Sequence, residues 1–363
     1  MAQVLSIFGD LAKRLQIVID RKLDAFEQPW YDQYFDMAPA QASLSFTSVI
    51  GKSRIEAAAS VVNRDSLTPL RSRASLDKLT GEIPAIKEKI KMTESDYREY
   101  KVIQAMGLDQ NLQVQQALDL LYGDVKKVGD SAHKRLDIMA LEAVSTGQIS
   151  LTIVNNPDGL VLDNPVDLLM PLTNRIDASV MWTDAVNADP FLDIQSAVDT
   201  ANDRGIVFAK MLMAQTTWQK MRATKKVRDL MTLLAYGKSG AGDVGAATTL
   251  AKVNQYLADE NLPIIEVVNK PVGIEKDGKP GILRPFSEKN VSFIPAGKLG
   301  DIKNAYAIEE TEKVDNVVYG TYKRALISKW KENEPFAEWT KVELNAIPAL
   351  TAIDSIHLLK VVA

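Results

Sequence analysis

Cysteine is absent from this 363-residue chain, and histidine occurs only twice, at His133 and His357. The missing thiols exclude disulfides, thiolate nucleophiles and cysteine-ligated zinc, and the shortage of imidazole disfavours metal binding and acid–base catalysis. No apolar run reaches the roughly 18 residues of a transmembrane helix. Charges at Asp10, Lys13 and Arg14 interrupt the apolar N-terminal stretch, so it does not resemble a signal peptide. The composition disfavours an enzyme, and we expect a protein made and kept in a cytoplasm.

The chain also has little net charge, −4 in total, which argues against a general nucleic-acid binder held by phosphate neutralisation. Between residues 43 and 91, however, nine basic side chains stand against five acidic ones, a local +4 that leaves −8 for the rest. The basic residues are Lys52, Arg54, Arg64, Arg71, Arg73, Lys78, Lys87, Lys89 and Lys91. A basic limb on an acidic body favours attraction between copies of the chain, and a solvated charged loop is the alternative.

The N-terminal third contains signals for an arm, an extended loop and a capped helix. Apolar residues at three- and four-residue spacing predict an amphipathic helix over 3–27, either an arm or a helix packed on its own domain. Residues 44–62 predict two strands around the turn GKSR, followed by a polar segment with proline. Thr93 has the signature of an N-cap, with Asp96 three residues later, so a helix should begin there.

A much longer helix is predicted from about Asn111 to Ser145, because one apolar stripe persists without proline. The stripe comprises Val114, Leu118, Leu121, Val125, Val128, Ala132, Leu136, Met139 and Ala143. The sequence then predicts a hairpin around Asn155–Gly159, and from about Asn174 an α/β domain in which helix and strand alternate. Another hairpin is expected at Lys276–Gly278, and short strands over 325–362.

Several motifs imitate functional sites. Residues 240–245 match G-x-G-x-x-G, but the preceding residues have helical spacing, whereas a dinucleotide-binding turn must follow a buried strand. Gly237 and Gly51 each begin a Gly-Lys-Ser tripeptide, but neither has the glycine that a P-loop needs five residues upstream. Four tryptophans could stack on a ligand, but packing in a core or interface is favoured on their scattered positions and an expected lack of interleaved basic residues: Trp182, Trp218, Trp330 and Trp339. His133, beside two basic residues, is interpreted as solvated or locally hydrogen-bonded.

Three segments, in this order, carry a resemblance to a known family: PLRSRASLDKLTGEIPAIKEKIKMTESDYREY, LDLLYGDVKKVGDSAHKRLDIMALEAVSTGQISL and ADPFLDIQSAVD. The chain resembles the major capsid protein E family of lambda-type tailed phages. The resemblance implies an α+β protein of the Hong Kong 97-type capsid fold. Its expected parts are an N-terminal arm (1–42), an extended β-hairpin loop (43–92), a peripheral domain with a long spine helix (93–173), an axial α/β domain (174–300) and a return to the peripheral domain (301–363).

The resemblance also implies partners. Copies of the chain would form hexamers and pentamers of an icosahedral head, built in the host cytoplasm with a scaffold, a portal and in some cases a decoration protein. Double-stranded DNA would be enclosed without sequence-specific binding, and no membrane, cofactor or metal is implied. Subunit contacts are expected at Arg54, Arg64, Arg71, Arg73 and Lys78, and a capsomer-centre loop at Gly237, Lys238, Gly240, Gly242 and Gly245. The alternatives are an encapsulin-type compartment shell and a nucleotide-dependent enzyme that uses the Gly240 loop.

Overall fold

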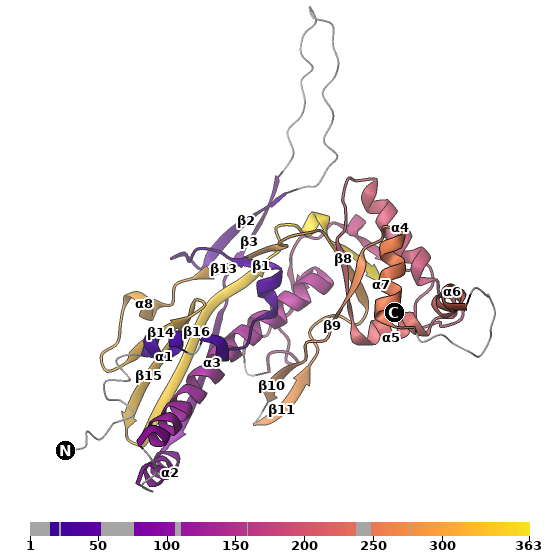
Figure 1. Ribbon diagram of the computed structural model, residues 1–363. Coiled ribbons are helices and arrows are strands. Elements are labelled where there is room, and N and C mark those ends of the chain that lie inside the picture. The colour runs from indigo at the N-terminus through magenta and orange to yellow at the C-terminus, as the bar shows by residue number, and fades with distance from the viewer. Residues whose placement is uncertain are drawn as a thin grey trace, which may run out of the picture. The chain divides into compact units, whose positions relative to one another are not determined.

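The computed structural model describes residues 15–21, 23–51, 76–105, 110–157, 159–236, 248–276 and 278–363. The chain divides into two compact units. The first unit combines Met1–Phe46, Gly81–Asp137 and Ile302–Pro348, and the second combines Thr47–Thr80, Ile138–Asp301 and Ala349–Ala363. Figure 1 labels many of the elements of both.

A sheet forms the frame of the first unit (Figure 1). Its described strands lie in the order β1, β13, β16, β15, β14, and β4 also pairs with β16. Their bounds are β1 (Phe35–Met37), β4 (Ala85–Thr93), β13 (Gly300–Ala305), β14 (Val318–Tyr322), β15 (Ala325–Asn333) and β16 (Phe336–Ala349). β16 is 14 residues long, so the expectation of only short strands in the tail is wrong. A strand of this length can pair with several neighbours, which explains its central place.

The helices of this unit include the long one predicted from the sequence. They are α1 (Leu15–Arg21), α2 (Glu94–Ala105), α3 (Gln110–Thr146) and α8 (Ile308–Thr311), with 3-10 turns η2 (Leu23–Ala25) and η3 (Trp30–Gln33). The part of α3 from Ile138 onward is counted in the second unit. α3 confirms the predicted helix, with 37 residues and a length of about 55 Å at 1.5 Å per residue. From Val125 onward its predicted stripe is buried: Val125, Val128, Ala132, Leu136, Met139 and Ala143 are at most 2% exposed.

One face of the sheet is covered by α1 and α3. A Cβ added to Gly320 of β14 would lie 2.8 Å from Ile19 of α1, and one added to Gly129 of α3 would lie 3.6 Å from Ile327 of β15. Gly320 and Ile327 are partners in the β14–β15 register and therefore belong to one face. The glycines permit these close approaches.

The N-terminal helix is shorter than expected. A helix to residue 27 was predicted, but α1 ends at Arg21 and a 3-10 turn follows at Leu23–Ala25. The reason lies on α3: Asp130 accepts a hydrogen bond from the backbone N–H of Glu27 at 3.1 Å, and Asp137 accepts from Trp30 and Tyr31 at 3.0 Å each. These charge-assisted bonds satisfy backbone N–H groups that would otherwise bond to carbonyl groups of a continuing helix.

The second unit contains a mixed sheet in the order β7, β17, β12, β8, β9, and the β7–β17 and β8–β9 pairs are parallel. The strands are β7 (Arg175–Asp177), β8 (Lys210–Ala214), β9 (Ile264–Val268), β12 (Asn290–Ile294) and β17 (His357–Lys360). The accompanying helices are α4 (Pro190–Asn202), α5 (Gln215–Ala223), α6 (Lys225–Tyr236) and α7 (Leu250–Asp259), with turns η4 (Leu172–Asn174) and η5 (Ile353–Ser355). The predicted alternation of helix and strand is confirmed.

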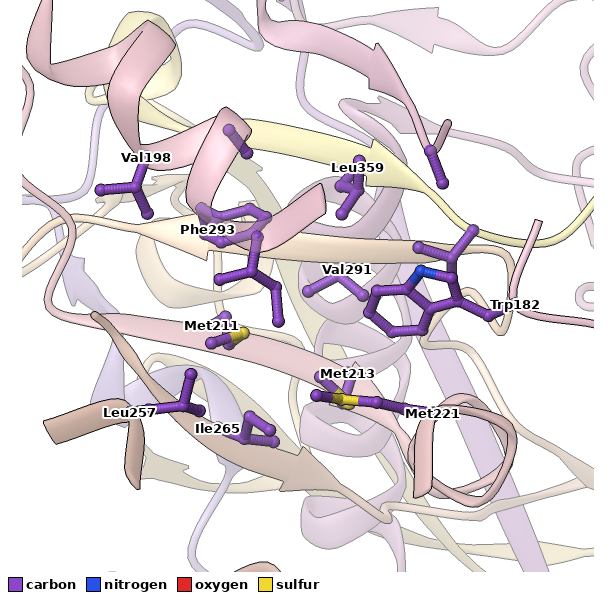
Figure 2. Close-up of a cluster of buried hydrophobic side chains, with 14 of the residues drawn as sticks. Trp182, Val198, Met211, Met213, Met221, Leu257, Ile265, Val291, Phe293 and Leu359 are labelled. Carbon is purple, nitrogen blue, oxygen red and sulfur yellow. The ribbon is translucent and has the colours of Figure 1, made fainter. Parts of the chain in front are cut away.

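The core of this unit lies between the sheet and its helices. Figure 2 shows Met211, Phe293 and Leu359 from three neighbouring strands together with Trp182 and Met221. All five are at most 1% exposed. Asp193 of α4 fixes the tryptophan, because its carboxylate accepts from Trp182 Nε1 at 2.9 Å.

The small two-stranded pairs test the hairpin predictions. β10 (Val272–Lys276) and β11 (Lys279–Leu283) confirm the hairpin at Lys276–Gly278. The hairpin around Asn155–Gly159 is confirmed only in part: among the described residues of this segment, the paired strands are the short antiparallel β5 (Gln148–Ile149) and β6 (Val166–Asp167), which lie farther from the turn than predicted. Asn155 explains the difference, because its side chain bonds Thr152 N and Ser150 O locally, and such bonds compete with a ladder.

The base of the predicted extended loop is described, and its middle is outside the described residues. β2 (Ser45–Gly51) pairs with β3 (Leu76–Glu82), and residues 52–75 lie between them. After β4, the capping prediction is confirmed: Asp96 N donates to Thr93 Oγ1 at 3.4 Å, Thr93 N donates to Asp96 Oδ2 at 2.8 Å, and α2 begins at Glu94. The Thr93 hydroxyl also donates to Asp96 Oδ2 at 2.7 Å, and this bond, followed by the one from Thr93 N, lowers the pKa of Asp96.

Candidate functional site

The face of the first unit's sheet opposite α1 and α3 carries tryptophans and lysines. The antiparallel registers place Trp339 of β16 between Trp330 of β15 and Lys91 of β4, and direct partners share one face. The two indole rings are stacked with centroids 6.3 Å apart, and the ammonium groups of Lys89 and Lys91 lie 4.5 and 5.5 Å from the Trp339 centroid. We call Lys89, Lys91, Trp330 and Trp339 the Trp–Lys patch.

The four tryptophans differ in their burial. Trp182 and Trp218 are buried, as core packing predicts. Trp330 and Trp339 are only half-buried, and Lys89 and Lys91 are exposed. The expected lack of interleaved basic residues is wrong, because Lys329 and Lys331 flank Trp330 in the sequence itself. Lys89 and Lys91 reach Trp339 from β4, and sequence spacing could not show those two contacts.

The charges around the patch are unequally neutralised. Lys341 pairs with Glu309 of α8 at 2.7 Å and with Glu343 at 2.9 Å, and Lys87 pairs with Glu343 at 3.0 Å. The hydrogen bond from Lys341 lowers the pKa of Glu309. Within the described part of the chain, no carboxylate forms an ion pair with Lys89 or Lys91. Two cations beside half-buried indoles remain available to a partner, and binding of an acidic surface is the chemistry they offer.

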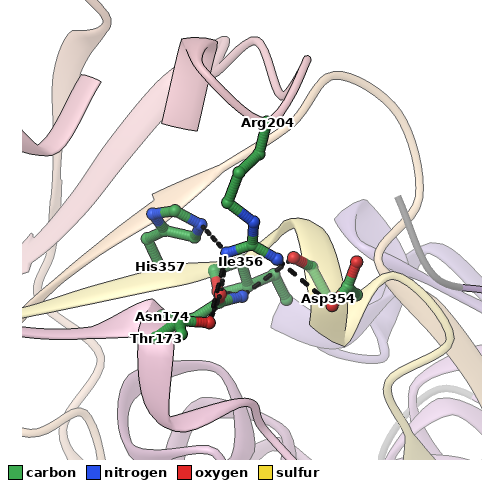
Figure 3. Close-up of polar contacts among 6 residues, drawn as sticks. All are labelled: Thr173, Asn174, Arg204, Asp354, Ile356 and His357. Atoms are coloured by element: carbon green, nitrogen blue, oxygen red, sulfur yellow. Dashed lines mark hydrogen bonds and ion pairs between the residues drawn. The ribbon is translucent and has the colours of Figure 1, made fainter. Parts of the chain in front are cut away.

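A second polar cluster, in the second unit, has residue types that often serve catalysis (Figure 3). Arg204, just after α4, contacts Asn174 and lies 3.4 Å from His357 Nε2 and 3.4 Å from Asp354 Oδ1. Asn174 also donates to the carbonyls of Asp354 and Ile356 at 2.8 and 2.9 Å. His357 is fully buried, and burial, followed by the charge of Arg204, lowers its pKa to about 4. The cluster ties η4, η5 and β17 together, and its imidazole has no access to a substrate.

His133, in the first unit, is also structural. Its Nδ1 is hydrogen-bonded with the Tyr31 hydroxyl at 2.8 Å, and its Nε2 lies 3.4 Å from the carbonyl oxygen of Tyr322. Burial lowers its pKa to about 4. The interpretation as solvated or locally hydrogen-bonded is therefore wrong: the side chain is only 3% exposed, and its partners lie 102 and 189 residues away in the sequence.

The predicted site residues fall mainly outside the described part of the chain. Lys78 is described, and it is exposed on β3 at the base of the extended loop. The other predicted contact residues, Arg54, Arg64, Arg71 and Arg73, lie outside the described residues, as do Gly237, Lys238, Gly240, Gly242 and Gly245. The segment before the Gly240 motif is helix α6, so the strand that a dinucleotide site requires is missing there.

The described residues also bear on metal and membrane sites. No group of three or more metal-ligating side chains occurs among them. Over the same residues, no helix has the length and apolarity needed to cross a bilayer.

Comparisons with known proteins agree with this architecture. The family model of phage major capsid protein E matches residues 33–361. A solved structure described as a prophage capsid protein from E. coli CFT073 is similar with a TM-score of 0.56 at 15% identity, covering 97% of this chain and 99% of that one. A phage-related protein from Bordetella bronchiseptica RB50 follows with a TM-score of 0.49 at 12% identity, covering 95% and 96% of the two chains.

An encapsulin from Synechococcus elongatus PCC 7942 is more distant, with a TM-score of 0.39 at 10% identity and coverage of 94% and 90%. No curated protein matches the chain. The family match spans nearly the whole sequence, including the strands of the Trp–Lys patch and the Arg204 cluster. This chain therefore belongs to the phage major capsid protein E family and has the Hong Kong 97-type capsid fold.

Proposed function

We propose that copies of this chain assemble into hexamers and pentamers, which close into the icosahedral head of a tailed phage around double-stranded DNA. The family match over residues 33–361 carries this proposal. The half-buried Trp330 and Trp339 support it, because tryptophan is enriched in interfaces between proteins, and among the described residues the lysines beside Trp339 form no ion pair. A scaffold, a portal and a decoration protein are further proposed partners.

The proposed role needs no catalysis, cofactor or metal. The parts expected from the sequence are carried into the proposal with their boundaries: an arm at 1–42, an extended loop at 43–92, a peripheral domain at 93–173 and 301–363, and an axial domain at 174–300. In this scheme the basic loop reaches a neighbouring subunit and residues 237–245 lie near the capsomer centre. The body of the chain is acidic, so affinity of isolated subunits for duplex DNA should be weak and independent of sequence.

The proposal is tested by assembly of the purified chain, followed by sedimentation velocity and electron microscopy. Wild-type chains should form rings or closed shells. The double variant Arg71→Glu/Arg73→Glu should keep its circular dichroism spectrum but fail to form closed shells, because arginine pairs well with carboxylates. The control Arg71→Lys/Arg73→Lys keeps both charges and should assemble.

Three outcomes contradict parts of this account. A strictly monomeric wild-type chain at high concentration would refute assembly itself. Normal shells from the charge-reversed variant would show that the loop is held by strands or apolar contacts instead of charge. Tight DNA binding by unassembled subunits at physiological salt would contradict the passive enclosure of the genome.

A further inference from the structure

The surface beside the Trp–Lys patch has the opposite character. Residues 308–315, which begin in α8, carry the carboxylates Glu309, Glu310, Glu312 and Asp315 against the single cation Lys313. Their apolar side chains are not covered: Ile308 is 72% exposed and Val314 is 58% exposed. We call residues 308–315 the acidic segment. Exposed apolar groups flanked by charge are typical of a contact surface.

The patch and the acidic segment belong to one unit and are joined by a short chain of contacts. Lys341 is the register partner of Lys89 on β4, and it pairs with Glu309 of the acidic segment at 2.7 Å. The acidic segment therefore begins next to the lysines. Within the described residues, Glu312 and Asp315 form no ion pair, just as Lys89 and Lys91 form none. A basic surface and an acidic surface thus lie side by side, and within the described residues the four charges named above form no ion pair.

We infer that the Trp–Lys patch of one copy binds the acidic segment of a second copy, and that the contact is reciprocal across a two-fold axis. A two-fold interface uses the same surface on both copies, so that surface must be complementary to itself. If residue i of one copy contacts residue j of the other, then residue j of the first copy also contacts residue i of the second. A patch with its complement beside it meets this requirement. Lys89 and Lys91 would meet Glu312 and Asp315, and Val314 would pack against the indoles. The inference rests on the proposed self-assembly and names one of its contacts.

Charge complementarity identifies the occupant. The patch offers two cations and two half-buried rings, although Trp339 Nε1 donates to the Glu332 carboxylate at 2.8 Å. The acidic segment offers exposed apolar groups and the carboxylates of Glu312 and Asp315, which form no ion pair among the described residues. A nucleic acid is the other occupant that lysine and tryptophan could bind, through phosphate contacts and base stacking. The second copy is favoured because it also accounts for the exposed Ile308 and Val314, which a nucleic acid on the patch would leave uncovered.

The test uses the absence of native cysteine, which makes introduced thiols the only ones in the chain. Lys91→Cys chains with one tag are mixed with Asp315→Cys chains with another, assembled and then oxidised. We expect a reducible dimer that contains both tags, whereas a control mixture of Lys276→Cys and Asp315→Cys chains should give none. Because the cysteines are on different chains, only a contact between copies can produce the product.

Charge reversal supplies a second readout. Each exposed ion pair is worth a factor of roughly 2 to 5 in affinity, so Lys89→Glu/Lys91→Glu should weaken self-association about tenfold or more, and Lys89→Gln/Lys91→Gln should weaken it less. Adding Glu312→Lys/Asp315→Lys to the reversed lysines should restore association. If the lysines only stabilised the fold of their own chain, swapping the charges would not restore self-association.

The outcomes separate this inference from the proposed function. Shells that form without the mixed disulfide, or from Lys89→Glu/Lys91→Glu chains at normal concentration, would overturn the inference and leave self-assembly standing. The same holds if the reversal leaves assembly intact but abolishes binding of a short duplex DNA, which would assign the patch to nucleic acid. A chain that never associates would refute the proposed function itself.

Discussion

Acid should destabilise this protein through its two histidines, because both are buried as neutral rings. In the folded chain burial lowers the pKa of His133 and His357 from 6.5 to about 4. His133 faces Tyr31, Tyr322, Lys323 and Asp32, and His357 faces Arg204 and Asp354. Between these two pKa values the unfolded state binds more protons than the folded state, so stability is complete above about pH 6.5 and falls as the pH approaches 4.

The size of the effect follows from the two pKa values. With 6.5 for the unfolded chain and about 4 for the folded chain, each histidine withdraws on the order of 2 kcal/mol of stability at pH 5 and on the order of 3 kcal/mol at pH 4. A typical domain has a free energy of unfolding of only about 5–15 kcal/mol. Acidification to pH 5 should therefore lower the urea midpoint of unassembled subunits clearly.

Two measurements check this reasoning. Urea unfolding at pH 7 and pH 5 should show a smaller pH dependence for His133→Gln and for His357→Gln than for the wild type, and the smallest for the double variant. Because the chain has only two histidines, NMR titration of their ring protons should give two resonances that each variant assigns. Titration of either ring near pH 6.5 in the folded subunit, or equal pH dependence in wild type and double variant, would refute the account.

The remaining predictions concern buried contacts that stabilise the two units. Asp193→Ala should lower the free energy of unfolding in urea by roughly 2–4 kcal/mol. The reason is that the buried carboxylate accepts hydrogen bonds from Ser179 N, Ser179 Oγ and Trp182 Nε1. A near-ultraviolet dichroism signal of Trp182 that stays unchanged in the variant would contradict this. Gly300→Ala should prevent native folding, since the added Cβ would lie 2.1 Å from the Ala349 carbonyl oxygen. The control Gly273→Ala should be tolerated, because a Cβ added there meets nothing within 4 Å. Thermal melting of both variants measures the difference. Lys329 and Glu338 form a buried 2.8 Å ion pair without hydrogen-bond geometry. Lys329→Met should therefore cost about 3–5 kcal/mol in urea unfolding, while Lys329→Met/Glu338→Leu should be near neutral, and a double variant as unstable as the single one would disprove this.

Local patterns in the sequence were enough to predict several elements. The stripe from Val125 to Ala143 predicted α3 because helical periodicity is a property of neighbouring residues. Thr93 and Asp96 predicted the start of α2 for the same reason, since a capping box is complete within four residues. The helical spacing before Gly240 also excluded a dinucleotide turn without any structure.

Tertiary contacts decided the features that local patterns could not show. Carboxylates of α3, about 100 residues away in the chain, end the N-terminal helix early by bonding the backbone N–H groups of Glu27, Trp30 and Tyr31. The candidate site is of the same kind: Lys91 and Trp339 are register partners only because β4 and β16 pair, and no spacing in the sequence encodes that pairing. Composition showed a basic limb on an acidic body, but strand pairing determined which lysines are neutralised by Glu343 and which remain beside the tryptophans.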